Sequence, residues 1–120
     1  MKLKKDNKIY FEGLHFFYNI IYECDAECYD SLLKLRPFIL FGKGLENTGN
    51  VDNLILCLKG IILIYEKNVA VYHDSNNLRN DYISCMLRRK LNELANHKNE
   101  DIANYAGKII SLFDNSMNTE

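Results

Sequence analysis

The stretch that decides the fold is 91-LNELANHKNEDIANYAGKIISLF-113, close to the C-terminus. Its apolar residues recur every three or four positions on either side of a polar centre, as they do along amphipathic helices. His97, Lys98 and Asn99 form that centre, and the side chain of Asn99 is suited to cap a second helix. We therefore expect a helix, a tight turn in which the imidazole of His97 bonds backbone groups, and a closing helix.

Helical spacing of apolar residues also governs the chain upstream of this stretch. Asp25 can cap a helix, and Pro37, the single proline, fits the first turn of the next one. Residues 46–50 have turn chemistry, and the stretch from Asn68 to Asn80 predicts a loop, with room for a short anchored segment at residues 69–72. No segment alternates polar and apolar residues as a strand would. The predicted fold class is all-α, with helices at residues 9–23, 25–35, 37–46 and 51–67 and one helix or a closely joined pair at residues 82–94.

Short, medium and long helices recur in that order along the chain. The helices at residues 25–35, 37–46 and 51–67 form one unit of about 40 residues, which is the period of the armadillo repeat. The helix at residues 9–23 would be the long third helix of a truncated preceding unit, and residues 80–113 would be a closing unit. The expected organisation is a basic tail at residues 1–8, an armadillo-like α-solenoid of about two and a half repeats at residues 9–114, and a polar tail at residues 115–120.

Composition and charge narrow the classes of function. The 120 residues carry a formal net charge of -1, so no global field attracts nucleic acid or an anionic membrane. The most apolar run, residues 54–65, is shorter than the roughly 20 residues that cross a bilayer. The N-terminus lacks the apolar region of a signal peptide. We expect a reducing compartment, in which the cysteines serve as small apolar core residues: Cys24, Cys28, Cys57 and Cys85.

The sequence predicts neither a metal, a cofactor nor an enzymatic activity. The four cysteines form no CxxC pair, and the step from Cys24 to Cys28 places both on one helix face rather than in a zinc knuckle. The three histidines, His15, His73 and His97, lie on separate predicted elements. Gly-rich phosphate loops and nucleophile elbows are missing from the sequence.

The spacing of eight residues near the C-terminus resembles one family, the C-terminal armadillo repeats of importin subunit alpha. The closing repeat of that family has two aliphatic residues three positions apart, a His-x-Asn turn, an isoleucine, a small alanine and an aromatic end. The residues here that match this order are Leu91, Leu94, His97, Asn99, Ile102, Ala106, Ile110 and Phe113. The resemblance implies a structural closing-repeat motif at Leu94, His97, Asn99, Ile102 and Ala106.

A second match lies at 12-EGLHFFYN-19, which is similar to the family's Glu-Ala-Ala-Trp-Ala-Ile-x-Asn. In the family, the Trp ring stacks on the stems of a basic peptide, the Asn amide bonds its backbone, and acidic residues pair with its charges. The resemblance implies a peptide-binding row at Glu12, His15 and Asn19. Because His15 replaces the Trp, and Lys59 and Leu63 stand at the corresponding positions of the next long helix, binding is expected to be weakened or lost.

The resemblance implies an adaptor of nuclear protein import that works in the cytoplasm and the nucleus. Its expected partners are basic localisation-signal peptides and a nuclear-export receptor of the importin-beta type. Two alternatives stay open: a generic helical-repeat interaction module without cargo binding, and a truncated, non-functional adaptor fragment. The first helix looks buried on most sides, and if it lacks preceding helices, Phe11, Phe16 and Phe17 predict an apolar patch through which the chain self-associates.

Overall fold

The computed structural model describes residues 3–46 and 50–118, with side chains for residues 8–46 and 50–115. Within these residues it contains helices and no strand, so the prediction of an all-α fold is confirmed. Residues 47–49 of the predicted turn and the outermost residues of both predicted tails lie outside the described part. The helices are α1 (Leu3–Glu23), α2 (Ala26–Leu33), α3 (Pro37–Gly44), α4 (Val51–Tyr72), α5 (Asn76–Ser84), α6 (Leu87–Leu94) and α7 (Glu100–Asn118).

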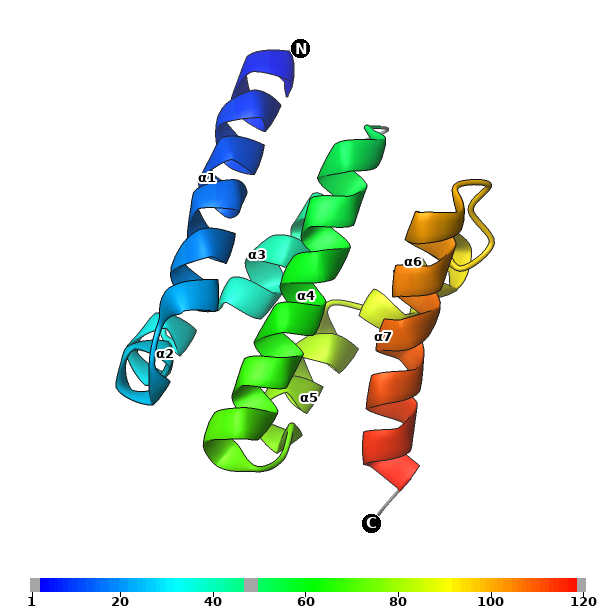
Figure 1. The fold of residues 1–120 in the computed structure, drawn as a ribbon. Coiled ribbons are helices and arrows are strands. Elements are labelled where there is room, and N and C mark those ends of the chain that lie inside the picture. Colours follow the sequence, from blue (N-terminus) through cyan, green and yellow to red (C-terminus); the bar gives the residue numbers. More distant parts are fainter. Residues whose placement is uncertain (1–2, 47–49, 119–120) are drawn as a thin grey trace.

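The three long helices, α1, α4 and α7, lie side by side and run in the same direction (Figure 1). The central helix, α4, packs against α1 on one side and α7 on the other. The short helices α3, α5 and α6 form a second layer behind them, where α3 packs on α4 and α6 packs on α7. The molecule is therefore a two-layer helical stack whose core lies between the long and the short helices.

The order short, short, long occurs twice, as α2–α3–α4 and as α5–α6–α7. Pro37 and Leu87, which begin α3 and α6, are 50 positions apart, so the unit is longer than the expected 40 residues. The residue before each of them is in the left-handed region: Arg36 has φ 56° and Met86 has φ 54°. This shared backbone turn makes the two units structurally alike at the junction where their short helices meet.

The left-handed turn at Met86 decides between the two structures that the sequence predicts for residues 82–94. α5 ends at Ser84 and α6 begins at Leu87, so the closely joined pair is confirmed and one continuous helix is wrong. The chain makes this turn without glycine, at a cost of roughly 1–2 kcal/mol for a left-handed L-residue.

Several predicted boundaries were set by local chemistry and are confirmed. The backbone N–H of Cys28 donates to Oδ1 of Asp25 at 2.8 Å, so Asp25 caps α2. Pro37 is the first residue of α3. The N–H groups of Asp101 and Ile102 donate to Oδ1 of Asn99 at 2.9 and 3.2 Å, so Asn99 caps α7.

Other boundaries were wrong. α1 begins at Leu3, within the predicted basic tail, and α7 continues to Asn118, within the predicted polar tail. The predicted loop from Asn68 to Asn80 is mostly helical, because α4 continues to Tyr72, and α5 begins at Asn76. His73 ends α4 in the left-handed conformation, with φ 68°.

Two glycines allow the layers to approach closely. A β-carbon at Gly60 of α4 would overlap the ring of Phe41 in α3, and one at Gly44 would overlap the thiol of Cys57. The packing of α1 is looser than expected: Phe11 and Leu14 are buried, but one whole side of the helix is exposed. The prediction that this helix is buried on most sides is therefore wrong.

Candidate functional site

The three long helices share an exposed side that faces away from the short helices, here named the long-helix face. On α4 it carries Asp52, Lys59 and Glu66, each seven positions after the last and all exposed. Lys108 of α7 reaches across to Glu66, with Nζ 3.7 Å from Oε2, so α4 and α7 contribute to the same face. Asn104 and Ser111 of α7, four positions before and three positions after Lys108, are also exposed.

The orientation of α1 places the predicted peptide-binding row on this same side. The hydroxyl of Tyr10 donates to the carbonyl of Leu40 in α3, and the ring of Phe17 stacks on Phe41 with centroids 6.3 Å apart. Tyr10 and Phe17 therefore point toward the short-helix layer. Glu12 and Asn19, each two positions later, lie about 200° further round the helix.

All three predicted row residues, Glu12, His15 and Asn19, are exposed. The structure thus brings them together in one accessible strip of α1, beside the exposed row of α4. Their spacing of three and four positions was enough to predict a shared helix face. The expectation that the first helix is buried on most sides does not hold for this strip.

Tyr22 extends the row by one further step, and sequence reasoning missed it. Its side chain is 60% exposed, and its ring stacks on Tyr18 with centroids 6.5 Å apart and planes 20° apart. The signal was present, because Tyr22 follows Asn19 at helical spacing. A flat, exposed ring therefore stands at the end of a row that lacks the family's Trp.

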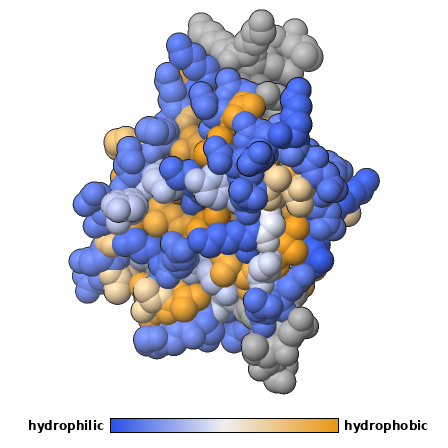
Figure 2. Space-filling view, turned by 45° about the vertical axis from the view of Figure 1, so that its right-hand side comes forward, coloured by the Kyte–Doolittle hydropathy of each residue, from blue (hydrophilic) through white to orange (hydrophobic). Residues whose placement is uncertain are grey.

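The neighbouring row on α4 carries charges of both signs. Lys59 is exposed, between the exposed Asp52 and Glu66, and Leu63 is half-buried. The long-helix face thus presents a carboxylate on α1, at Glu12, and on α4 the ammonium of Lys59 between the carboxylates of Asp52 and Glu66. Figure 2 shows the molecule with the α7 side turned forward, and in this view apolar patches lie between hydrophilic side chains on the surface.

A buried polar network holds the lower end of α4 in place. The hydroxyl of Tyr29 in α2 donates to Oδ1 of Asn68 at 2.8 Å, and both residues are fully buried. Nδ2 of Asn68 donates to the carbonyl of Asp74 at 2.9 Å and to Oδ1 of Asn77 in α5 at 2.6 Å. Burial raises the pKa of Tyr29, so it stays a neutral donor. The network joins α2, α4 and α5.

Further contacts fix α1 against its neighbours. Nζ of Lys67 donates to the carbonyl of Cys24 at 2.8 Å, which ties α4 to the chain just after α1. Tyr10 is held by its bond to α3, and burial raises its pKa to about 12. The row on α1 is therefore presented by a helix anchored near both ends.

The predicted closing-repeat residues lie in the core or in the turn before α7. Leu94, Ile102 and Ala106 are buried in the core between α6 and α7. The backbone N–H of Asn99 donates to Nδ1 of His97 at 3.0 Å, so the predicted role of the imidazole in the turn is confirmed. These residues shape the end of the fold and do not extend the exposed rows.

The cysteines behave differently from one another. Cys57 is fully buried, as predicted, and burial raises the pKa of its thiol to about 12. Cys28 is exposed and Cys24 and Cys85 are only half-buried, so the prediction that all four are core residues is wrong. Cys28 follows a helix cap and faces solvent because α2 buries little more than Tyr29.

The part of the chain that the structure describes offers no other chemical centre of note. It contains no group of three His, Cys, Asp or Glu side chains arranged to hold a metal ion. None of its helices combines the length and the apolar character that a bilayer span requires. His15, His73 and His97 lie on α1, after α4 and before α7.

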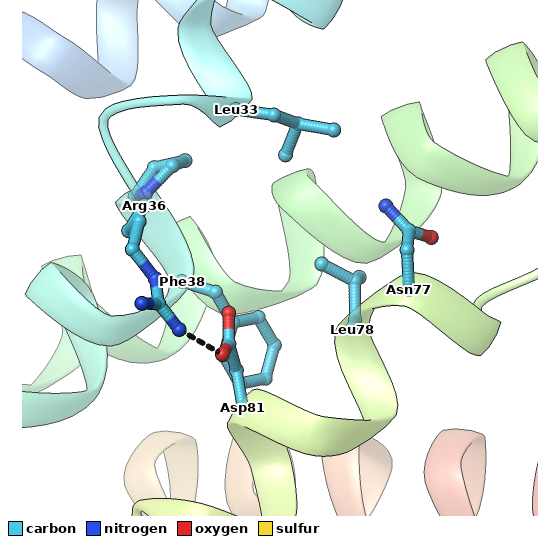
Figure 3. A pocket seen from close by; sticks show the side chains of 7 residues that line it. Leu33, Arg36, Phe38, Asn77, Leu78 and Asp81 are labelled. Atoms are coloured by element: carbon cyan, nitrogen blue, oxygen red, sulfur yellow. Dashed lines mark hydrogen bonds and ion pairs between the residues drawn. The ribbon is translucent and has the colours of Figure 1, made fainter.

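A small cavity of about 90 Å³ lies on the opposite layer (Figure 3). Nη2 of Arg36 is 2.7 Å from Oδ1 of Asp81 at its edge, so its two charged side chains are already paired. Ligand pockets commonly measure about 300–1,000 Å³, so the cavity is small for an organic substrate. Sequence reasoning did not find it, because its lining comes from three separate helices and the turn before α3: Leu33, Arg36, Pro37, Phe38, Asn77, Leu78 and Asp81.

The long-helix face is therefore the larger candidate site, with side chains that suit hydrogen bonding, ion pairing and stacking. No family model, curated protein or solved structure matches this chain, so a functional proposal depends on the geometry and chemistry of this face.

Proposed function

We propose that the chain is an armadillo-type, importin-alpha-like protein-binding module that takes an extended peptide across its long-helix face. The observation that carries the proposal is the exposed row of Glu12, His15 and Asn19 on α1, beside the exposed row of α4. The repeated order of short, short and long helices, with the long helices parallel and adjacent, supports an armadillo-type arrangement (Figure 1).

The row on α1 has the chemistry needed to hold an extended basic peptide. The amide of Asn19 both donates and accepts, so it can bond the peptide's main chain, and Glu12 can pair with a lysine or an arginine. Tyr22 supplies an aromatic face on which an aliphatic stem or a cation can lie. In this proposal Tyr22 takes over part of the stacking for which the resembled family uses Trp.

The charge on α4 restricts the ligand. The ammonium of Lys59 repels a basic residue placed over α4 and attracts an acidic one. The proposed ligand therefore has its basic residues over α1 and a neutral or acidic residue over Lys59, between the carboxylates of Asp52 and Glu66. A peptide that is basic along its whole length would bind more weakly.

The wider setting follows from the same resemblance. As an adaptor in nuclear import, the module would meet basic localisation signals in the cytoplasm and release them in the nucleus. A nuclear-export receptor of the importin-beta type would bind the closing unit, α5 to α7. We propose these partners as the first ones to test.

The test is a fluorescence anisotropy titration of the purified chain with a labelled basic localisation peptide at low and moderate salt. We expect saturable binding that weakens with salt, and about tenfold weaker binding after Glu12→Gln or Asn19→Ala. Glu93→Gln is the matched control, because Glu93 is exposed on α6 in the short-helix layer. Absence of saturable binding at both salt concentrations would refute cargo recognition by this face.

One observation favours a second candidate, a helical-repeat module without basic cargo. Lys59 stands exposed in the middle of the central row, where a basic peptide would cross. Titration with an acidic peptide of the same length separates the two candidates. Tighter binding of the acidic peptide, lost in Lys59→Gln, would support the second candidate over the first.

A further inference from the structure

The outer edge of α1 carries large apolar side chains that reach solvent. Ile9 is 62% exposed and Phe16 is 68% exposed. Together with Gly13 and the half-buried Ile20 they lie four, three and four positions apart, which places them on one strip of the helix. This strip is here named the α1 edge.

The α1 edge is distinct from the long-helix face. Helical geometry places Phe16 about 160° from the buried Leu14, so the α1 edge points away from the core side. Glu12 and Asn19 lie between these directions, on the side shared with α4. An occupant of the α1 edge therefore leaves the exposed rows of α1 and α4 accessible.

The α1 edge has a gap at Gly13, here named the notch, between the large side chains of Ile9 and Phe16. A β-carbon at Gly13 would meet nothing within 4 Å, so the space above this position is open. On either side of it stand Ile9 and Phe16. Along the strip the side chains are large, absent, large and large. In an antiparallel pair of α1 helices, Phe16 of one copy therefore lies opposite Gly13 of the other at the centre of the contact.

We propose that the α1 edge binds a second copy of this chain, with the two α1 helices antiparallel about a two-fold axis. Phe16 of each copy then fills the notch at Gly13 of the other. Ile9 of each copy lies against Ile20 of the other. An isologous contact of this kind makes every favourable contact twice.

Charge complementarity selects a second copy as the occupant. Lys8 is exposed near the start of α1, and Glu23 is exposed at its last residue. Antiparallel pairing brings Lys8 of one copy close to Glu23 of the other, at both ends of the contact. Parallel pairing would place like charges together, which is unfavourable.

The expected association is weak, because one helix pair buries less surface than the roughly 1,200 Å² of a stable complex. We expect a dissociation constant on the order of tens of micromolar. The inference goes beyond the proposed function and does not depend on it. Peptide titration tests the long-helix face, and mass measurement tests the α1 edge, so one can fail without the other.

Sedimentation velocity of the full chain from about 1 µM to 1 mM tests the proposal. We expect monomer at the low end and dimer at the high end. Phe16→Ala should abolish the dimer, whereas Tyr22→Ala, which removes a similarly exposed aromatic from the other side of α1, should not. Monomer throughout the range would overturn the proposal.

Gly13→Ala gives the sharpest test, because its two effects have opposite signs. Alanine improves the helix, so the melting temperature of the dilute monomer rises. It also fills the notch, so the dissociation constant of the dimer rises about tenfold. Gly107→Ala is the matched control, because Gly107 is also helical with nothing within 4 Å. It should stabilise the monomer and leave the dimer unchanged.

Exchange of charges tests the antiparallel direction. Glu23→Lys should weaken the dimer several-fold, and adding Lys8→Glu should restore it, because the swapped pair is again complementary. Failure of the second change to restore the dimer overturns this register. A mass that grows beyond the dimer, in an association that Gly107→Ala weakens, would instead show head-to-tail stacking of α1 on α7. That result would overturn the two-fold contact.

Discussion

The ring of Phe41 in α3 occupies the space that a β-carbon on Gly60 of α4 would need. Phe41 is fully buried, and the same ring stacks on Phe17 of α1. Gly60 therefore lets the short-helix layer come close enough to seat one aromatic ring between all three elements. The position of α1 relative to α4, and with it the proposed binding face, depends on this close approach.

Gly60→Ala should destabilise the fold although alanine is the better helix former. The added methyl group has to displace the ring of Phe41, and overpacking of this kind costs about 1–3 kcal/mol. Urea unfolding followed by circular dichroism measures the change. Gly107→Ala, in open space, should instead stabilise by about 0.5–1 kcal/mol. Equal effects of the two substitutions would contradict the packing described here.

Asn68→Leu should be strongly destabilising. The hydroxyl of the buried Tyr29 loses its Asn68 acceptor and keeps only the carbonyl of Ile64, at 3.2 Å, and the bonds of Asn68 to Asp74 and Asn77 are removed. A buried polar group that loses its partner costs about 1–3 kcal/mol. Asn104→Leu on the exposed face of α7 is the control and should change the free energy of unfolding by less than about 0.5 kcal/mol. Denaturant midpoints of the two variants give the comparison.

Asn68 also shows why part of the fold could not be predicted. In the sequence it stands at the start of the predicted loop, but in the structure its side chain is hydrogen-bonded inside the core. Its partners are Tyr29, 39 positions away, and the chain that follows α4. A polar residue such as Asn68 predicts a loop on the assumption that its side chain is solvated. The local sequence does not show that a tyrosine 39 positions away hydrogen-bonds to it instead.

Features that depend on neighbours in sequence were predictable. The caps at Asp25 and Asn99, the start of α3 at Pro37 and the shared strip of Glu12 and Asn19 all follow from spacing or from local hydrogen bonds. The exposure of Phe16 was also expected as part of an apolar patch. Phe11 and Phe17, expected beside it, turn inward because α3 packs on that side of α1.

Met86→Gly should stabilise the protein. Met86 has φ 54° and is 60% exposed, so glycine removes the left-handed strain and little packing is lost. The expected gain is about 1 kcal/mol in the free energy of unfolding. Arg36→Gly should gain less, because it also removes the ion pair with Asp81. The melting temperatures of the two proteins test this prediction. If Met86→Gly melts below the unchanged chain, the backbone at Met86 is not strained.

Cys57 should make the fold sensitive to alkaline pH. Burial raises the pKa of its thiol from 9.0 to about 12, so the folded state disfavours the thiolate that the unfolded chain forms freely. Stability from this group is complete below pH 9 and is lost as the pH rises from 9 toward 12. Urea unfolding should give a lower free energy of unfolding at pH 10.5 than at pH 8, and this difference should be smaller in Cys57→Ala.

Lys59→Glu should convert the long-helix face into a better site for a basic peptide. The substitution replaces a repulsive charge on the row of α4 by an attractive one, on the same face as Glu12. At low salt we expect the dissociation constant of a basic localisation peptide to fall about tenfold, and at moderate salt less, because the Debye length is about 10 Å at 0.1 M. Arg89→Glu makes the same change of charge on the exposed side of α6. If both variants strengthen binding equally, net charge rather than the long-helix face governs the interaction. If only Lys59→Glu does, the peptide crosses α4 at this residue.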